Sequence, residues 1–188
     1  MRTRTENAAR TRRALLDAAI TLVDSGGPEA VTLRAVGDGA GVSRGAAYRH
    51  FADKDALLTA IAVEAWGEVA HGLEAIVEDD SQTPADALRS ALIAISDLGR
   101  ARPHLYRLMF SVPADGDMSA TAAGERAQDG FLALVERVTG RADALPIAGL
   151  LFAVTHGLTD LDLSGHLPRD KWAAGRHELL ELAVARLT

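Results

Sequence analysis

Residues 31–58 read VTLRAVGDGAGVSRGAAYRHFADKDALL, and this stretch decides the fold of the N-terminal part of the chain. Thr32 is placed to cap one short helix and Ser43 to cap the next, because both side chains can accept a hydrogen bond from an N–H group at a helix start. Gly41 lies between the two helices and gives the backbone the freedom that a sharp turn needs. Two short helices joined in this way, behind a longer amphipathic helix, predict a helix-turn-helix, which can place one helix in the major groove of DNA.

The whole chain has the composition of an all-α protein. Its 188 residues include 36 Ala, 48% of them are hydrophobic, and only 4% are aromatic. Ala is the best helix former, and short alternating stretches between turn residues are missing, so we predict about nine helices. Thr83-Pro84 is expected to start one of them, Pro146 to open an apolar helix, and the last helix to run from Asp170 to Leu187.

Charge is distributed unevenly along the chain. Residues 1–56 carry nine Lys and Arg against seven Asp and Glu, a net charge of +2, whereas residues 57–188 carry 11 against 19, a net charge of −8. A basic N-terminal part on an acidic body is typical of a nucleic-acid-binding head. We therefore predict a DNA-binding domain over residues 1–56 and a second helical domain over residues 57–188.

The composition also excludes several kinds of site. The sequence has no Cys, which excludes disulfide bonds, Cys-ligated zinc, iron–sulfur clusters and thiol nucleophiles. The longest uncharged run, residues 144–159, contains a Pro and a Gly and is shorter than the roughly 18 apolar residues of a membrane span. We expect a cytoplasmic protein with no cofactor, no metal and no membrane partner.

Several motifs of the quoted stretch occur in register and resemble the N-terminal domain of TetR-type repressors. The resemblance covers about residues 10–60. It rests on Thr32-Leu33-Arg34-Ala35-Val36, Ala40-Gly41-Val42-Ser43-Arg44-Gly45, Tyr48-Arg49-His50-Phe51, and Lys54 with Leu57-Leu58. It implies a homodimer that binds double-stranded operator DNA and releases it when a small-molecule effector binds. Residues 57–188 are then the ligand-binding and dimerisation domain.

The expected DNA contacts follow from side-chain chemistry and from this resemblance. Arg can form two hydrogen bonds to guanine O6 and N7, Ala can meet a thymine methyl, and hydroxyl and cationic groups suit phosphate. The resemblance implies phosphate contacts for Thr32, Tyr48, His50 and Lys54. It implies base contacts or close approach to bases for Arg34, Arg44, Gly45 and Ala46. Ser43 adds a hydroxyl and a backbone N–H group at the start of the helix.

The C-terminal part resembles the TetR-type ligand domains that are named for a Trp…His-Gly motif. The matching residues are Phe152-Ala153-Val154-Thr155-His156-Gly157, in which Phe152 stands at the Trp position and offers no indole N–H. A ligand pocket is usually apolar with a few polar groups that converge on the ligand. The expected lining residues are Trp66, His104, Tyr106, Met109, Phe110, Phe131, Phe152, Thr155 and His156.

Two helices are expected to form the dimer interface. The helix of residues 144–165 is apolar nearly all round, and the last helix carries a run of leucines. Helices of this kind bury their apolar surface, and two such helices from each copy can form a four-helix bundle. The expected interface residues are Leu151, Leu158, Leu179, Leu180 and Val184.

Other interpretations of the same residues stay open. His156 and Asp160 lie one helical turn apart, but no third ligand is marked by spacing, so His156 is either a core histidine or a polar pocket contact. The alternative function is a small cytoplasmic all-α enzyme that acts on an apolar ligand, and turnover without DNA affinity would identify it. A third alternative is a DNA-binding regulator that needs no ligand.

Overall fold

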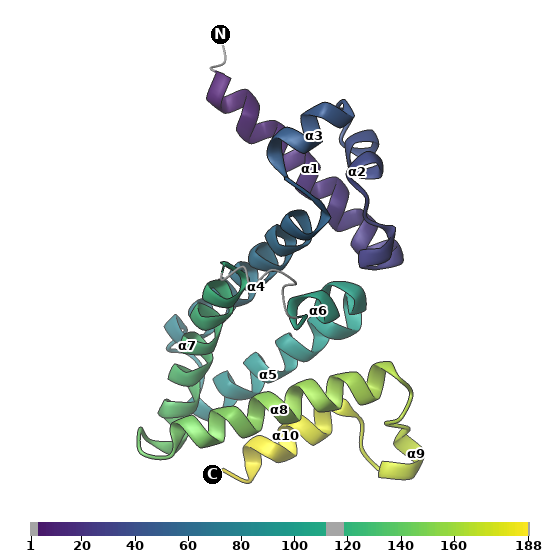
Figure 1. Cartoon of the computed structure of the whole chain (residues 1–188). Coiled ribbons are helices and arrows are strands. Elements are labelled where there is room, and N and C mark those ends of the chain that lie inside the picture. Colours follow the sequence, from purple (N-terminus) through teal and green to yellow (C-terminus); the bar gives the residue numbers. More distant parts are fainter. Residues whose placement is uncertain (1–3, 112–118, 188) are drawn as a thin grey trace. The chain divides into compact units, whose positions relative to one another are not determined.

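The computed structural model describes residues 4–111 and 119–187 of the chain (Figure 1). Every regular element in these two ranges is a helix, which confirms the all-α prediction. The chain divides into two compact units, one of Met1–Trp66 with His104–Ala122 and the other of Gly67–Pro103 with Ala123–Thr188. The boundary between the units falls within the long helix α4 (Lys54–Glu78), so this helix contributes to both.

The first unit is built around the helix-turn-helix. Its elements are α1 (Arg4–Gly26), the 3-10 helix η1 (Pro28–Ala30), α2 (Leu33–Gly39), α3 (Arg44–His50), the first half of α4, and α6 (Pro103–Met109). Its most deeply buried side chains come from α1, α2, α3 and α4 and from the segment before α2, and they include Leu15, Ala19, Val23, Val31, Val36, Ala47 and Leu57. Helices as short as α2 and α3 are marginal on their own, so this shared core is what holds them.

Two glycines let α2 lie close to α1. Gly37 is buried, and a Cβ on Gly39 would lie 3.3 Å from the Cβ of Ala18 in α1. Each glycine costs about 1 kcal/mol relative to Ala in a helix interior. Packing against α1 therefore orders α2 in spite of its weak helix propensity.

The second unit is a bundle of helices. Its elements are the second half of α4, α5 (Pro84–Ala101), α7 (Ser119–Thr139), α8 (Ala144–Leu163), α9 (Arg169–Trp172) and α10 (Arg176–Ala185). Helices α5, α8 and α10 contact one another pairwise, and Leu88, Leu92 and Leu180 are completely buried there. Arg126 of α7 donates two hydrogen bonds to the Glu74 carboxylate of α4, at 2.9 and 2.8 Å, and so ties α7 to α4.

Capping residues set several helix boundaries as predicted. The hydroxyl of Thr83 accepts a hydrogen bond from the N–H of Asp86 at 3.2 Å, and Pro84 is the first residue of α5. Pro146 lies in the first turn of the apolar helix α8, which begins at Ala144 rather than at the proline. A proline is tolerated there because the N–H groups of a first turn have no partner within the helix.

The predicted last helix is wrong in one respect, because it is interrupted and forms α9 and α10. Ala173 has the left-handed backbone conformation, with φ 55° and ψ 9°, and this ends α9. The N–H of Gly175 then donates to the Glu178 carboxylate at 2.7 Å, and α10 begins at the next residue. Glu178 also pairs with Arg169, so one carboxylate bridges both sides of the break.

Candidate nucleic-acid interface and ligand pocket

The starts of α2 and α3 carry fixed hydroxyl groups. The Ser43 hydroxyl accepts a hydrogen bond from the N–H of Ala46 at 3.3 Å, and the Thr32 hydroxyl accepts one from the N–H of Ala35 at 3.1 Å. Both residues therefore act as the predicted helix caps. Because the cap uses the oxygen as an acceptor, each O–H can still donate to a phosphate oxygen.

The turn between α2 and α3 depends on one glycine. Gly41 has φ +67°, a conformation that side chains rarely adopt, and the N–H of Val42 closes the turn on the carbonyl of Gly37 at 2.9 Å. Nothing lies within 4 Å of the place where a Cβ on Gly41 would stand. The glycine is therefore required for its backbone conformation and not for space.

Most of the predicted DNA contacts lie at the surface of the head. Tyr48 is 46% exposed, which is a high value for an aromatic side chain. The other exposed members are Thr32, Arg34, Ser43 and Gly45, and the half-buried ones are His50 and Lys54. Ala46 differs from them, since it is only 9% exposed, and the side chain of Arg44 lies outside the described part of the structure.

One exposed arginine on α3 was not among the predicted contacts. The Nη1 atom of Arg49 lies 3.9 Å from the place where a Cβ on Gly45 would stand. The two residues are four apart and share one face of the helix. That spacing is the signal that could have marked Arg49, whose guanidinium sits beside an open stretch of backbone and suits a phosphate or guanine contact.

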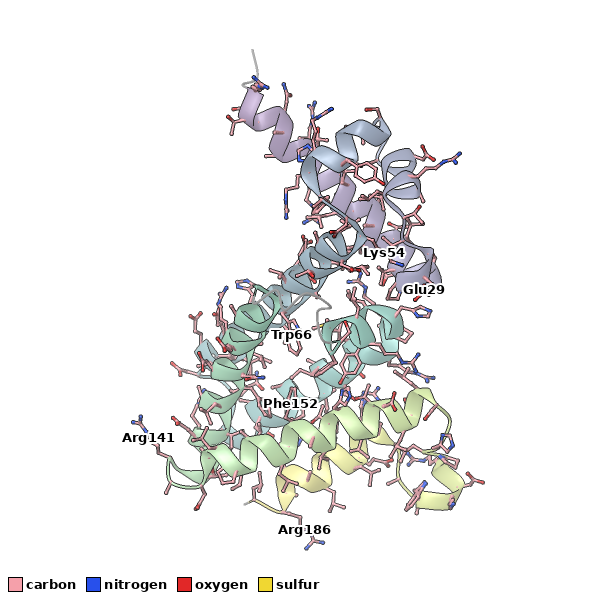
Figure 2. The ribbon with its side chains drawn as sticks, viewed as in Figure 1. Glu29, Lys54, Trp66, Arg141, Phe152 and Arg186 are labelled. Carbon is pink, nitrogen blue, oxygen red and sulfur yellow. The ribbon has the colours of Figure 1, made fainter. Side chains whose placement is uncertain are left out.

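Two weak ion pairs hold cations at the edge of this surface. The Nζ of Lys54 is 3.9 Å from the Glu29 carboxylate (Figure 2), and the Nε of Arg34 is 4.0 Å from the Asp38 carboxylate. Glu29, Arg34 and Asp38 are exposed, so solvent screens both pairs and each contributes at most about 1 kcal/mol. A phosphate can replace either carboxylate at little cost.

Two arginines of α1 contact residues that lie outside α1 in the first unit. The Arg12 guanidinium lies 5.0 Å from the centre of the Phe51 ring. Arg13 bridges Asp17 and Glu64, with N–O distances of 2.5 and 2.6 Å, and these hydrogen bonds raise the pKa of Arg13 above its usual range. Because Glu64 belongs to α4, these contacts tie α1 to the helix that follows the helix-turn-helix.

Five of the predicted pocket residues lie in the first unit. Trp66 is buried, and its indole N–H donates to the backbone carbonyl of Met109 at 3.0 Å. The ring of Phe110 meets Trp66 edge-on, with 5.2 Å between the ring centres, and lies 4.9 Å from the ring of Tyr106. These four residues pack the end of α6 against α4, and His104 is half-buried at the start of α6.

The other four predicted pocket residues lie in the second unit. Phe131 and Phe152 line a cavity of about 320 Å³ between α7 and α8, and Figure 2 shows Phe152 on α8. Thr155 is buried and donates its hydroxyl to the carbonyl of Leu151 at 2.7 Å, and His156 is half-buried. Within the described residues, no group of three or more His, Cys, Asp or Glu is arranged to hold a metal ion.

A second cavity in this unit was not predicted. It measures about 230 Å³ and lies between α4 and α5. Of the described residues that line it, only Glu68 is ionisable, and the rest are small or aliphatic, such as Gly72, Ile76, Ala91 and Leu98. Such residues are indistinguishable from ordinary core in a sequence, which is why no pattern marked this cavity.

The predicted interface residues lie largely inside the chain. Those that are at most 2% exposed are Leu151, Leu180 and Val184. Leu158 and Leu179 are half-buried. The exposed leucines of the same two helices are others, namely Leu145, Leu150, Leu161 and Leu182, which are 71%, 60%, 43% and 49% exposed.

Helix α8 is long and apolar enough to cross a membrane by length and composition alone. Its most apolar 18-residue window has a mean hydropathy of 1.4, and 28% of that window is buried within the chain. One such helix is weak evidence for a membrane span, because a helix buried inside a protein has the same composition. Much of the apolar surface of α8 is thus exposed on a single chain.

Two family profiles match the chain. "Bacterial regulatory proteins, tetR family" matches residues 15–61, and "Tetracyclin repressor-like, C-terminal domain" matches residues 88–187. The chain belongs to the TetR family. The first match covers the helix-turn-helix, and the second covers most of α5 and all of α6, α7, α8, α9 and α10. This TetR-family protein is therefore a transcriptional regulator with a DNA-binding head.

Solved structures share the TetR-family fold. A protein of unknown function from Rhodococcus sp. RHA1 is 27% identical with a TM-score of 0.81, over 94% of this chain and 93% of that one. A TetR transcriptional regulator from the same organism is 20% identical with a TM-score of 0.64, over 95% and 96%. SmeT in complex with triclosan is 24% identical with a TM-score of 0.64, over 94% and 89%. No curated protein matches the sequence.

Proposed function

We propose that this TetR-family protein is a ligand-responsive repressor that binds a palindromic operator as a homodimer and leaves it when a small molecule binds. The observation that carries the proposal is the exposed flank of α3, where Gly45 leaves the backbone open beside Tyr48 and Arg49. A major groove about 12 Å wide admits one such helix. The capped hydroxyls of Thr32 and Ser43 on the same head suit the flanking phosphates.

The proposal includes a dimer, because one recognition helix makes few contacts. Two copies can place their α3 helices on one face of DNA, about 34–36 Å or a multiple apart. The exposed leucines of α8 and α10 support this, since burying a Leu side chain contributes about 1.5–3 kcal/mol. Pairing α8 and α10 with the same helices of a second copy would form a four-helix bundle.

Release requires that effector binding and DNA binding oppose one another. SmeT, which shares the fold, holds triclosan, a small molecule. We place the effector of this protein in the second unit, which holds a cavity of about 320 Å³ between α7 and α8 and a smaller one of about 230 Å³ between α4 and α5. A coupling of about 1–3 kcal/mol, which is typical of allostery, corresponds to a loss of DNA affinity of roughly 5- to 150-fold.

The direct test selects DNA with the full chain. Duplexes that the protein retains from a random pool are sequenced, and we expect a palindrome with two half-sites on one face of the helix. Gel retardation of that duplex is then repeated with a panel of small molecules, and we expect some of them to release it. Failure to retain any duplex would refute the DNA-binding role, and retardation that no small molecule reverses would refute the ligand response.

Lysine substitutions test the phosphate contacts separately. Lys54→Ala should weaken binding to all duplexes alike and reduce the slope of log K against log salt by about 0.9 for each phosphate that the variant no longer neutralises. Lys171→Ala is the matched control, because the sequence has only these two lysines and Lys171 lies exposed on α9. An unchanged salt slope for Lys54→Ala, or the same change in both variants, would contradict the assignment of Lys54.

A further inference from the structure

The cavity between α7 and α8 is lined by aromatic and aliphatic residues and by two polar residues, one of which is acidic. Its volume is about 320 Å³, near the lower limit of about 300 Å³ for small-molecule pockets. Phe131 and Phe152 supply two aromatic rings, and the remaining apolar lining is aliphatic. Among the residues that the structure describes, its polar lining residues are Gln128 and Asp129, and no Lys, Arg or His lines it. The cavity therefore offers one negative charge and aromatic surface to whatever enters.

The charge of Asp129 is not neutralised by its neighbours. Arg126, one turn earlier on α7, directs its guanidinium to Glu74, at 2.9 and 2.8 Å. In the part of the chain that the structure describes, no hydrogen bond or ion pair engages the Asp129 carboxylate. Asp129 itself is exposed, so its carboxylate is accessible to a ligand at the wall of the cavity.

We propose that this cavity binds a small hydrophobic cation, an amine with an aryl or alkyl body, with Asp129 as its counter-ion. This inference rests on the proposed function, since it names the class of effector for that site. The apolar body fills the space beside Phe131 and Phe152, and the ammonium group meets the carboxylate at the wall. A cation gains from both the ion pair and the face of an aromatic ring, whereas a carboxylate ligand would be repelled by Asp129.

A second copy of the chain is the competing occupant, and the position of the cavity argues against it. The lining residues of α8 are Leu145, Ala148, Gly149 and Phe152, at spacings of three and four that place them on one stripe. The exposed Leu150 follows Gly149 by one residue and points about 100° away around the helix. Leu150 and Leu161 thus lie on a different stripe of α8 from most of the cavity lining, although Leu145, which is 71% exposed, lies on the stripe that lines the cavity.

Three probes of one shape test the charge preference. We would titrate the full chain with 4-phenylbutylamine, 4-phenylbutanol and 4-phenylbutanoate by calorimetry at neutral pH, where they are a cation, a neutral molecule and an anion. The amine should bind about fivefold to thirtyfold more tightly than the alcohol, and the carboxylate should bind most weakly. Equal affinities, no binding, or preference for the carboxylate would overturn the proposal.

Two variants locate the charge. Asp129→Asn should reduce the affinity for the amine to that for the alcohol and leave the alcohol unaffected. Glu68→Gln is the matched control, because Glu68 is the ionisable residue of the other cavity. If Glu68→Gln and not Asp129→Asn removes the preference for the amine, the site is assigned to the wrong cavity. An affinity for the amine that falls as the protein concentration rises would show a second copy in the cavity and would also overturn the proposal.

Gel retardation separates this inference from the proposed function. If the amine binds through Asp129 and leaves the DNA bound, the site assignment stands and the proposed ligand response fails. If the alcohol or the carboxylate releases the DNA and Asp129→Asn has no effect, the ligand response stands and the assignment of a cationic effector is overturned.

Discussion

A pair of buried hydroxyls joins α5 to α8, and its removal should have a distinctive effect on stability. Ser96 and Thr159 are 0% and 1% exposed, and their hydroxyl oxygens lie 2.6 Å apart. Thr159 uses its single proton to donate to the carbonyl of Thr155 at 2.7 Å. Ser96 must therefore be the donor between the two hydroxyls, and Thr159 the acceptor.

The two single substitutions should have unequal costs. Ser96→Ala removes the donor and leaves the Thr159 hydroxyl bonded to Thr155, so we expect a loss of about 1 kcal/mol in the free energy of unfolding. Thr159→Val has nearly the same shape but leaves the Ser96 hydroxyl buried without its acceptor, which costs about 1–3 kcal/mol. The double variant contains neither hydroxyl, so its cost should be less than the sum of the two by about 1–2 kcal/mol.

Urea unfolding followed by far-UV circular dichroism measures all four proteins of this cycle. Thr139→Val is a suitable control in combination with Ser96→Ala, because the Thr139 hydroxyl donates only to backbone carbonyls of α7 and its end. That pair should show additive costs. If the costs of Ser96→Ala and Thr159→Val also add, the two hydroxyls do not interact and the reasoning is refuted.

Three further predictions concern the dimer, the turn and acid stability. Leu150→Asp should yield monomers of unchanged helix content in sedimentation, because Leu150 is 60% exposed on the chain, and an intact dimer would move the interface elsewhere. Gly41→Ala should cost about 1–2 kcal/mol in urea unfolding through its φ of +67° alone, and an unchanged stability would show that the turn adapts. Burial by itself would raise the pKa of Asp97, but hydrogen bonds from Arg176 and His177 outweigh it and hold the pKa below its usual 3.8. This stabilisation is present above about pH 4 and is lost as the pH falls through the lowered pKa, so Asp97→Asn should reduce stability at pH 7 and flatten its acid dependence. A parallel acid dependence of the urea midpoint in both proteins would contradict it.

Local signals made the head predictable. Thr32 and Ser43 cap α2 and α3 of the head, and Thr83 caps α5 of the second unit in the same way, because a cap is a contact between residues three apart and needs no knowledge of the rest of the fold. The sharp turn at Gly41 is local for the same reason. Because these contacts are short-range, the helix-turn-helix can be predicted from the sequence alone.

Features that depend on packing were not predictable in the same way. Helix α8 is apolar nearly all round, so its periodicity does not tell which stripe faces its own chain, and Leu151 faces inward while Leu150 faces outward. Ala173 carries no turn signal, and the predicted helix from Asp170 to Leu187 passes over Gly175, the one breaker in this segment. Ala46 was expected at DNA because it lies on the recognition helix, and the structure places it at the edge of the core.

A substitution at Ala173, where α9 ends, should raise the thermal stability of the protein. An L-residue other than glycine or asparagine in the left-handed region carries a strain of roughly 1–2 kcal/mol. Ala173→Gly relieves that strain at a position distant in sequence from the recognition helix and from the residues that line either cavity. A more stable form of this TetR-family protein for crystallisation or biosensor use could therefore be obtained from a residue outside the proposed nucleic-acid and effector sites.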